Sequence, residues 1–212
     1  MDTGDLIKAM AVEAGRPSMP LGKAWWMGFS LAVVLAAVVF FVTLGLRPDI
    51  AHAVETVRFL FKFVVTLALV FSAASLLRML IRPEGDARAL TPWLLAAPLL
   101  LAAATVLELF AVPQSDWAAR LIGSNSMVCL TFIPLIGVGP LAVFLATLRH
   151  GAPTKPRFAG AVAGLLAGGL SATFYAAQCS DDSPLFVATW YTIAIAGLTL
   201  AGALIAPRIT RW

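Results

Sequence analysis

Long apolar runs and short polar breaks alternate along almost the whole chain. Six runs are long enough to cross a bilayer, which takes about 20 apolar residues in a helix. They cover residues 24–46, 59–80, 90–110, 125–148, 158–178 and 185–206. None shows the strict apolar/polar alternation of barrel strands, and hydrocarbon offers no partner for an unpaired backbone group. The pattern therefore predicts an all-α integral membrane protein, with a bundle of six transmembrane helices within residues 24–212.

The first 23 residues follow a different pattern and predict a short amphipathic helix. Thr3 is a suitable N-cap, Asp5 lies in the first turn where the helix dipole favours negative charge, and Gly15 with Pro17 predicts the end. Apolar residues recur at three- to four-residue spacing and form one stripe: Leu6, Ile7, Met10 and Ala14. A helix of about 12 residues is marginal alone in water, so this stripe needs a surface to cover it.

Three surfaces are available to that stripe: the bilayer interface, the cytoplasmic end of the bundle, or a groove on another protein. Helices that lie on membranes are usually rich in Lys and Arg on their polar face. Here the polar face has an acidic start and carries both Lys8 and Glu13. This mixed charge favours residues 1–23 as a cytoplasmic segment that presents a helix to a protein partner.

The charged residues support the membrane assignment and predict an orientation. Charged residues make up only 12% of the chain, against about 25% in soluble proteins. Of the 15 Lys and Arg residues, 11 lie in one set of alternate loops and the two terminal segments: Lys8, Arg16, Lys23, Arg78, Arg82, Arg88, Arg149, Lys155, Arg157, Arg208 and Arg211. The positive-inside rule places this set, and so both termini, in the cytoplasm. The formal charge of +4 reflects this topology and does not indicate direct nucleic-acid binding.

The two cysteines are predicted to lie on the opposite, outer side. Cys129 is about four residues inside the outer end of the fourth span, and Cys179 is at the outer end of the fifth. They are candidates for a disulfide, for a pair of soft metal ligands, or for simple apolar packing. Nearby outer residues offer further weak candidates for metal ligands: Asp181, Asp182 and His52. No CxxC or HxxxH spacing marks a dedicated metal site.

The spans carry few groups that transport would use. Lys62 and Arg78 are near enough to the ends of the second span to snorkel, and Glu108 lies at the outer end of the third. A small six-span transporter or channel is the alternative from another functional class. It is supported only by prolines as possible helix breaks: Pro98, Pro134 and Pro140.

The sequence does not predict an enzyme. An intramembrane hydrolase needs its nucleophile and base at one depth. Ser124 and Ser126 are predicted near the outer face, whereas His150 is predicted on the cytoplasmic side. No cofactor is expected either.

A small-residue ridge marks the fifth span. Gly160, Gly164 and Gly168 repeat every four residues. Such a ridge allows close helix packing, either inside the monomer or against a second copy of the chain.

Several segments together resemble the NrsF family of membrane anti-sigma factors. They are DTGDLIKAMA at the start, LGLRPD after the first span, LRHGAPTKPRFAGAVAGLLAGG, CSDDSPLFVATWY and the terminal RW. The resemblance covers nearly the whole chain. Its most specific parts are the N-terminal DLI motif and the pattern made by Cys179, Pro184, Phe186 and Trp190.

The resemblance implies a function for the two features above. Members of the family have six spans and hold an extracytoplasmic-function (ECF) sigma factor inactive at the bacterial inner membrane. It implies that Asp5, Leu6 and Ile7 bind the sigma factor, with Met10 on the same stripe, and that Cys129 and Cys179 sense heavy metals or oxidants. The expected partners are then this sigma factor and membrane lipid, with association of two copies left open.

Overall fold

The computed structural model describes residues 3–4, 20–82, 88–151 and 153–210, and these contain helices and no strand. The longer helices are α2 (Leu21–Thr43), α4 (Val57–Leu80), α5 (Ala96–Ala111), α7 (Ser126–Arg149), α8 (Pro156–Ala176) and α10 (Thr192–Ile209). The shorter ones are α3 (Ile50–Ala53), η1 (Thr91–Leu95), α6 (Gln114–Ile122), α9 (Pro184–Phe186) and η2 (Val187–Tyr191).

Six helical segments of the described chain are long and apolar enough to cross a membrane, which confirms the predicted bundle. They are Leu21–Thr43, Val57–Leu80, Thr91–Ala111, Gln114–Arg149, Pro156–Ala176 and Pro184–Ile209. The helix predicted near the N-terminus, with Asp5, Leu6, Ile7 and Met10, lies outside the described residues. The sequence did not predict α6, a short helix that precedes α7.

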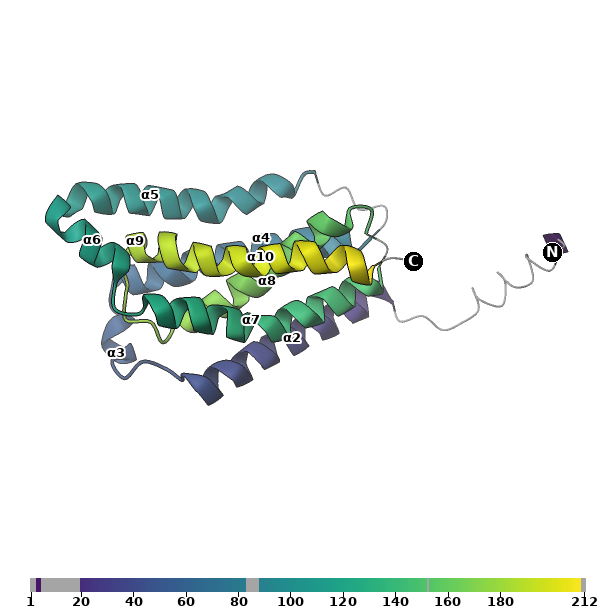
Figure 1. Cartoon of the computed structure of the whole chain (residues 1–212), viewed down its shortest axis with the longest axis horizontal. Helices are drawn as coiled ribbons and strands as arrows, with labels where there is room; N and C mark the ends of the chain where they lie inside the picture. The colour runs from purple at the N-terminus through teal and green to yellow at the C-terminus, as the bar shows by residue number, and fades with distance from the viewer. Residues whose placement is uncertain (1–2, 5–19, 83–87, 152, 211–212) are drawn as a thin grey trace.

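The bundle is organised around α8. This span is the most buried of the six, and it packs against α10, α4, α7 and α2. Figure 1 shows α5 along one side of the bundle and α2 along the other, where α2 lies against α7. The short helices α3, α6 and α9 gather at one end, on the left of Figure 1. The described chain therefore has one end built of short helices and loops and another end built of simple span connections.

The first span ends earlier than expected because of one glycine. The sequence predicted helix to residue 46, but α2 ends at Thr43. Gly45 has a φ of +71°, a left-handed conformation that favours glycine, and its N–H donates to the carbonyl of Phe40. This turn directs Arg47 back toward the loop that follows α8, and its N–H donates to the carbonyl of Ala177.

The predicted glycine ridge packs inside the monomer, against the backbone of α10. A Cβ at Gly160 would collide with the carbonyl of Gly202, and a Cβ at Gly164 would collide with the carbonyl of Leu198. The third glycine, Gly168, faces Ile195. The pair α8 and α10 makes the most extensive helix contact in the bundle. Missing side chains thus allow the close backbone approach that membrane helices use for association.

The prolines do not break their helices. Pro134 and Pro140 both lie inside α7, which runs without interruption from Ser126 to Arg149. Pro98 lies within α5. These three prolines therefore do not mark the helix breaks that would support a transporter.

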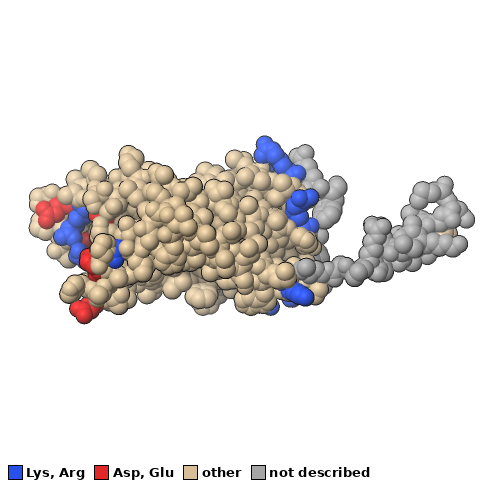
Figure 2. Space-filling view, turned by 90° about the horizontal axis from the view of Figure 1, so that it is seen from below, with Lys and Arg blue, Asp and Glu red and all other residues tan. Residues whose placement is uncertain are grey.

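Charged side chains separate between the two ends of the molecule. Among the residues that the structure describes, Figure 2 shows Lys and Arg as the charged residues at the end from which α2 starts, and a mixture of acidic and basic residues at the other end. This second end carries α3, α6 and α9, and we call it the outer end after the orientation that the sequence predicts.

The α8–α10 contact gives a direct stability test. We expect Gly164→Ala to destabilise the detergent-solubilised protein by about 1–3 kcal/mol, because its Cβ forces two backbones apart. Gly197→Ala is the matched control, since nothing lies within 4 Å of the added Cβ. Thermal unfolding of both variants measures the difference. Equal transition midpoints for the two variants would contradict this description of the packing.

Candidate functional site

The two cysteines lie in one buried cluster at the outer end. Cys129 is the fourth residue of α7, and Cys179 follows the end of α8, as the sequence predicted. Both are free thiols, with 0% and 1% exposure. The same cluster contains Tyr175 and Tyr191, whose ring centroids are 5.6 Å apart. Residues 50 apart in the chain are thus brought together, and one wall of their cluster comes from the π-helical turn η2.

Two cations converge on the backbone carbonyl of Cys179. The Nζ of Lys62 on α4 lies 2.8 Å from that oxygen, and Nη1 of Arg47 lies 3.3 Å from it. Both side chains also pair with the carboxylate of Asp182. Lys62 is only 1% exposed and Arg47 only 8%. We call this group (Arg47, Lys62, the Cys179 carbonyl and Asp182) the Cys179 latch.

The position of Lys62 corrects one expectation from the sequence. The ammonium was expected to snorkel toward the lipid headgroups, but it is turned inward and satisfied by the Cys179 carbonyl and Asp182. A buried cation needs such partners because desolvation penalises it heavily. Arg78, at the other end of α4, lies 5.8 Å from the ring of Trp26, an exposed aromatic residue of α2.

Asp181 ties the segment after Cys179 to the start of α7. Its Oδ2 accepts hydrogen bonds from the backbone N–H groups of Ser124, at 3.0 Å, and Asn125, at 2.8 Å. The side-chain amide of Asn125 also donates to it, at 2.9 Å. The carboxylate therefore lies at a helix N-terminus, where free N–H groups and the helix dipole favour an anion. Because α7 carries Cys129, this contact fixes the two cysteine segments to each other.

Glu108 on α5 makes a third tie. Its Oε2 accepts from the hydroxyl of Ser183, at 2.7 Å, and from the N–H of Leu185, at 3.1 Å. Its Oε1 lies 3.3 Å from Nη1 of Arg120 and 3.7 Å from Nη2 of Arg58. Segment 179–185 is thus held to α4, to α5, to the start of α7 and to the residues that follow α2.

Sequence reasoning missed this network, although one signal pointed to it. The positive-inside rule left four Lys and Arg residues on the outer side, where it disfavours them. All four take part in the ion pairs just described: Arg47, Arg58, Lys62 and Arg120. Lys and Arg residues on the side that the positive-inside rule disfavours therefore indicated that acidic partners lie nearby.

The ionisation of the outer loops follows from these contacts. The hydrogen bonds that Arg47 donates to Asp49, and to a lesser extent those to Asp182, raise the pKa of Arg47, although burial opposes this. The Arg47 hydrogen bond in turn lowers the pKa of Asp49, so this pair stays charged down to acidic pH. Burial raises the pKa of the Cys179 thiol, only partly offset by the charge of Lys62. The Cys179 thiol is therefore protonated at neutral pH.

Of the five predicted metal-ligand candidates, Cys129 and Cys179 lie in the buried cluster with Tyr175 and Tyr191. Asp181 and Asp182 are engaged by the start of α7 and by the latch, and His52 lies on the exposed helix α3. Among the described residues, no group of three or more His, Cys, Asp or Glu side chains is placed to hold a metal ion. Two buried thiols are nevertheless a donor set that suits a soft metal ion.

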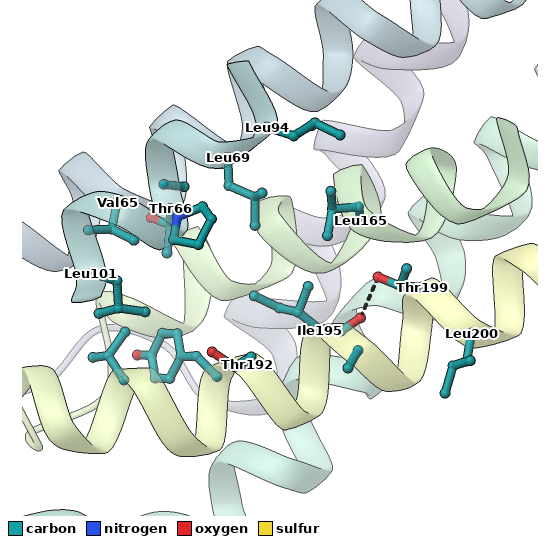
Figure 3. Close-up of a pocket in the computed structure, with 15 residues that line it drawn as sticks. Val65, Thr66, Leu69, Leu94, Leu101, Leu165, Thr192, Ile195, Thr199 and Leu200 are labelled. Carbon is teal, nitrogen blue, oxygen red and sulfur yellow. Dashed lines mark hydrogen bonds between the residues drawn. The ribbon is translucent and has the colours of Figure 1, made fainter. Parts of the chain in front are cut away.

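A separate apolar cavity of about 350 Å³ lies between α4, α5, α8 and α10. Figure 3 shows its lining, with Val65 and Leu69 on one side and Ile195 and Leu200 on another. The hydroxyl of Thr199 at its edge already donates to the carbonyl of Ile195. The residues that line the cavity include no charged side chain.

Ser124 and His150 are placed as the sequence predicted, at opposite ends of α7. The 24-residue helix between them corresponds to about 36 Å at 1.5 Å per residue. The two side chains therefore cannot act on one substrate bond.

The Glu108 tie gives a test of the network. We expect Glu108→Ala to reduce the free energy of unfolding by about 1–3 kcal/mol, because the buried N–H of Leu185 loses its acceptor. Asp116→Ala is the control, since this carboxylate is exposed and accepts a hydrogen bond from the neighbouring hydroxyl of Ser115. Thermal unfolding in detergent measures both. Identical stability of the two variants would mean that Glu108 does not hold the segment.

Comparison with known proteins matches this architecture to one family. The family model for NrsF, described as a negative regulator of sigma F, matches residues 10–212. An anti-sigma-F factor from Caulobacter vibrioides is 32% identical, and a probable anti-sigma-F factor from Azospira oryzae is 29% identical, each over 100% of both chains. No solved structure matches. The chain therefore belongs to the NrsF family of anti-sigma factors.

Proposed function

We propose that this protein holds an ECF sigma factor at the bacterial inner membrane and releases it when its outer thiols react. The observation that carries this proposal is the full-length similarity to relatives named as anti-sigma-F factors. The six spans anchor the chain in a membrane, and the charge difference between its ends supports cytoplasmic termini. Capture at the membrane keeps a sigma factor away from RNA polymerase.

The N-terminal helix is the proposed sigma-factor-binding element. Its apolar stripe of Leu6, Ile7 and Met10 is suited to a hydrophobic groove, and Asp5 lies at its start. Amphipathic helices bind partner grooves through residues at this three- to four-residue spacing. The predicted helix lies only a few residues before the start of α2 at Leu21, so its partner would be held near the membrane.

Cys129 and Cys179 are the proposed sensors of heavy metals or oxidants. A soft divalent metal ion would bind both sulfurs as thiolates and displace two protons to solvent. A two-electron oxidant would instead take two electrons and two protons from the thiols and leave a disulfide. Support comes from the burial of both thiols in one cluster at the outer end, where such chemistry persists.

The stripe can be tested directly. We expect the double variant Leu6→Asp, Ile7→Asp to lose about 2 kcal/mol or more of sigma-factor binding, because it places carboxylates where apolar anchors are buried. Binding to the sigma factor recovered with the intact chain is measured in detergent by co-purification. Lys8→Ala, off the stripe, is the matched control and should bind normally. Unchanged co-purification of the double variant would refute the helix-in-groove proposal.

The sensor role has a separate test. Cys129→Ser with Cys179→Ser should keep the sigma factor bound and abolish its release by Cd²⁺ or by a thiol oxidant, because neither thiolate ligation nor a disulfide is then available. A reporter gene driven by the sigma factor measures release in cells. Induction of the reporter by Cd²⁺ in the double variant would mean that both cysteines serve only in packing.

A further inference from the structure

We infer that the Cys179 latch couples the thiols to the N-terminal helix, and that α2 is the element that carries the change. This inference rests on the proposed function and identifies its route. The latch joins the backbone of a sensor cysteine to Arg47, four residues past the end of α2. The other end of α2 continues directly into the N-terminal segment.

The outer end of α2 is attached to the Cys179 segment by two kinds of contact. The N–H of Arg47 donates to the carbonyl of Ala177, at 3.2 Å, and its guanidinium donates to the carbonyl of Cys179. The same guanidinium forms a salt bridge with Asp182, at 3.2 Å. Arg47 is nearly buried, and its charge is paired with Asp182 and Asp49, so its contacts depend on the position of the Cys179 segment.

The reaction of the thiols must disturb these contacts. The Sγ of Cys179 lies 3.8 Å from the carbonyl oxygen of Asp181, and the residue is surrounded by buried neighbours. Joining this sulfur to Cys129, directly or through a metal ion, redirects the side chain within a packed interior that resists small displacements. The carbonyl held by Arg47 and Lys62 belongs to the same residue, so a backbone shift at Cys179 changes its contacts with both cations.

A displacement at Arg47 reaches the cytoplasmic end because α2 is one continuous helix. Its 23 residues correspond to a rod of about 35 Å. Along this rod α2 packs on α8, which precedes Cys179, through Phe40 against Phe174. It also packs on α7, which carries Cys129, through Trp25 stacked on Phe144. Packed helices of this kind shift between discrete arrangements, and a shift of α2 changes how the preceding residues are presented.

While the contacts of the Cys179 latch are formed, α2 stays in the arrangement that binds the sigma factor. Arg47→Met removes the guanidinium contacts with little change in side-chain length. We expect about tenfold weaker retention of the sigma factor without any stress reagent, equivalent to about 1.4 kcal/mol, and little further release by Cd²⁺. Arg47→Lys keeps a cation for the Cys179 carbonyl and should restore most of the retention.

Glu55→Gln is the control, because Glu55 is an exposed charged residue at the same end of the molecule and lies outside the latch. If Arg47→Met does not accumulate in membranes, Arg47→Gln takes its place with the same expected result. Wild-type retention by the neutral Arg47 variant, whether or not Cd²⁺ still acts, would overturn the coupling role of the latch.

A second measurement tests the latch without any sigma factor. Hydrogen exchange of the purified protein should show protection falling together in residues 44–47 and 177–183 when Cd²⁺ is added. The Cys129→Ser, Cys179→Ser variant should show neither change. A response confined to residues 177–183 would overturn the route through α2, even if sigma-factor capture and its release by Cd²⁺ stand. Failure of wild-type capture would instead refute the proposed function while leaving this readout intact.

Discussion

Close contact between α8 and α10 is the constraint on which the rest of the bundle depends. Lipid chains are as apolar as the side chains of the spans, so apolar burial alone does not hold membrane helices together. Glycines let the two backbones touch, and α8 then provides the surface on which α4 and α7 pack. With α7 and α8 both fixed, the two cysteines are brought to one place.

The outer end follows a different physical rule, in which every buried charge has a partner. Lys62, Arg47 and Glu108 are each nearly inaccessible, and each is paired with an opposite charge and with backbone groups of segment 179–185. Breaking one partner of such a set is costly, so the set specifies one arrangement more strongly than apolar packing does. In the proposed sensor role, a small chemical change at a thiol would then move the segment between distinct states.

Apolar run length was enough to predict the spans, because the bilayer imposes both helical structure and a minimum length. The glycine ridge and the position of both cysteines were also predictable. The inward turn of Lys62 was not, since local sequence does not reveal that Asp182, 120 positions away, lies beside it. The end of α2 depended on the conformation of Gly45, and the site network depended on contacts between distant loops. Asp5, Leu6, Ile7 and Met10 remain predictions from sequence pattern and resemblance.

The central claim is that the N-terminal segment captures a sigma factor. The most direct measurement compares proteins retained by the intact chain with those retained by a chain lacking residues 1–20, both solubilised from native membranes and analysed by mass spectrometry. We expect the intact chain to retain an ECF sigma factor and the truncated chain to lose it. Recovery of no sigma factor with the intact chain, or equal recovery with both, would contradict it.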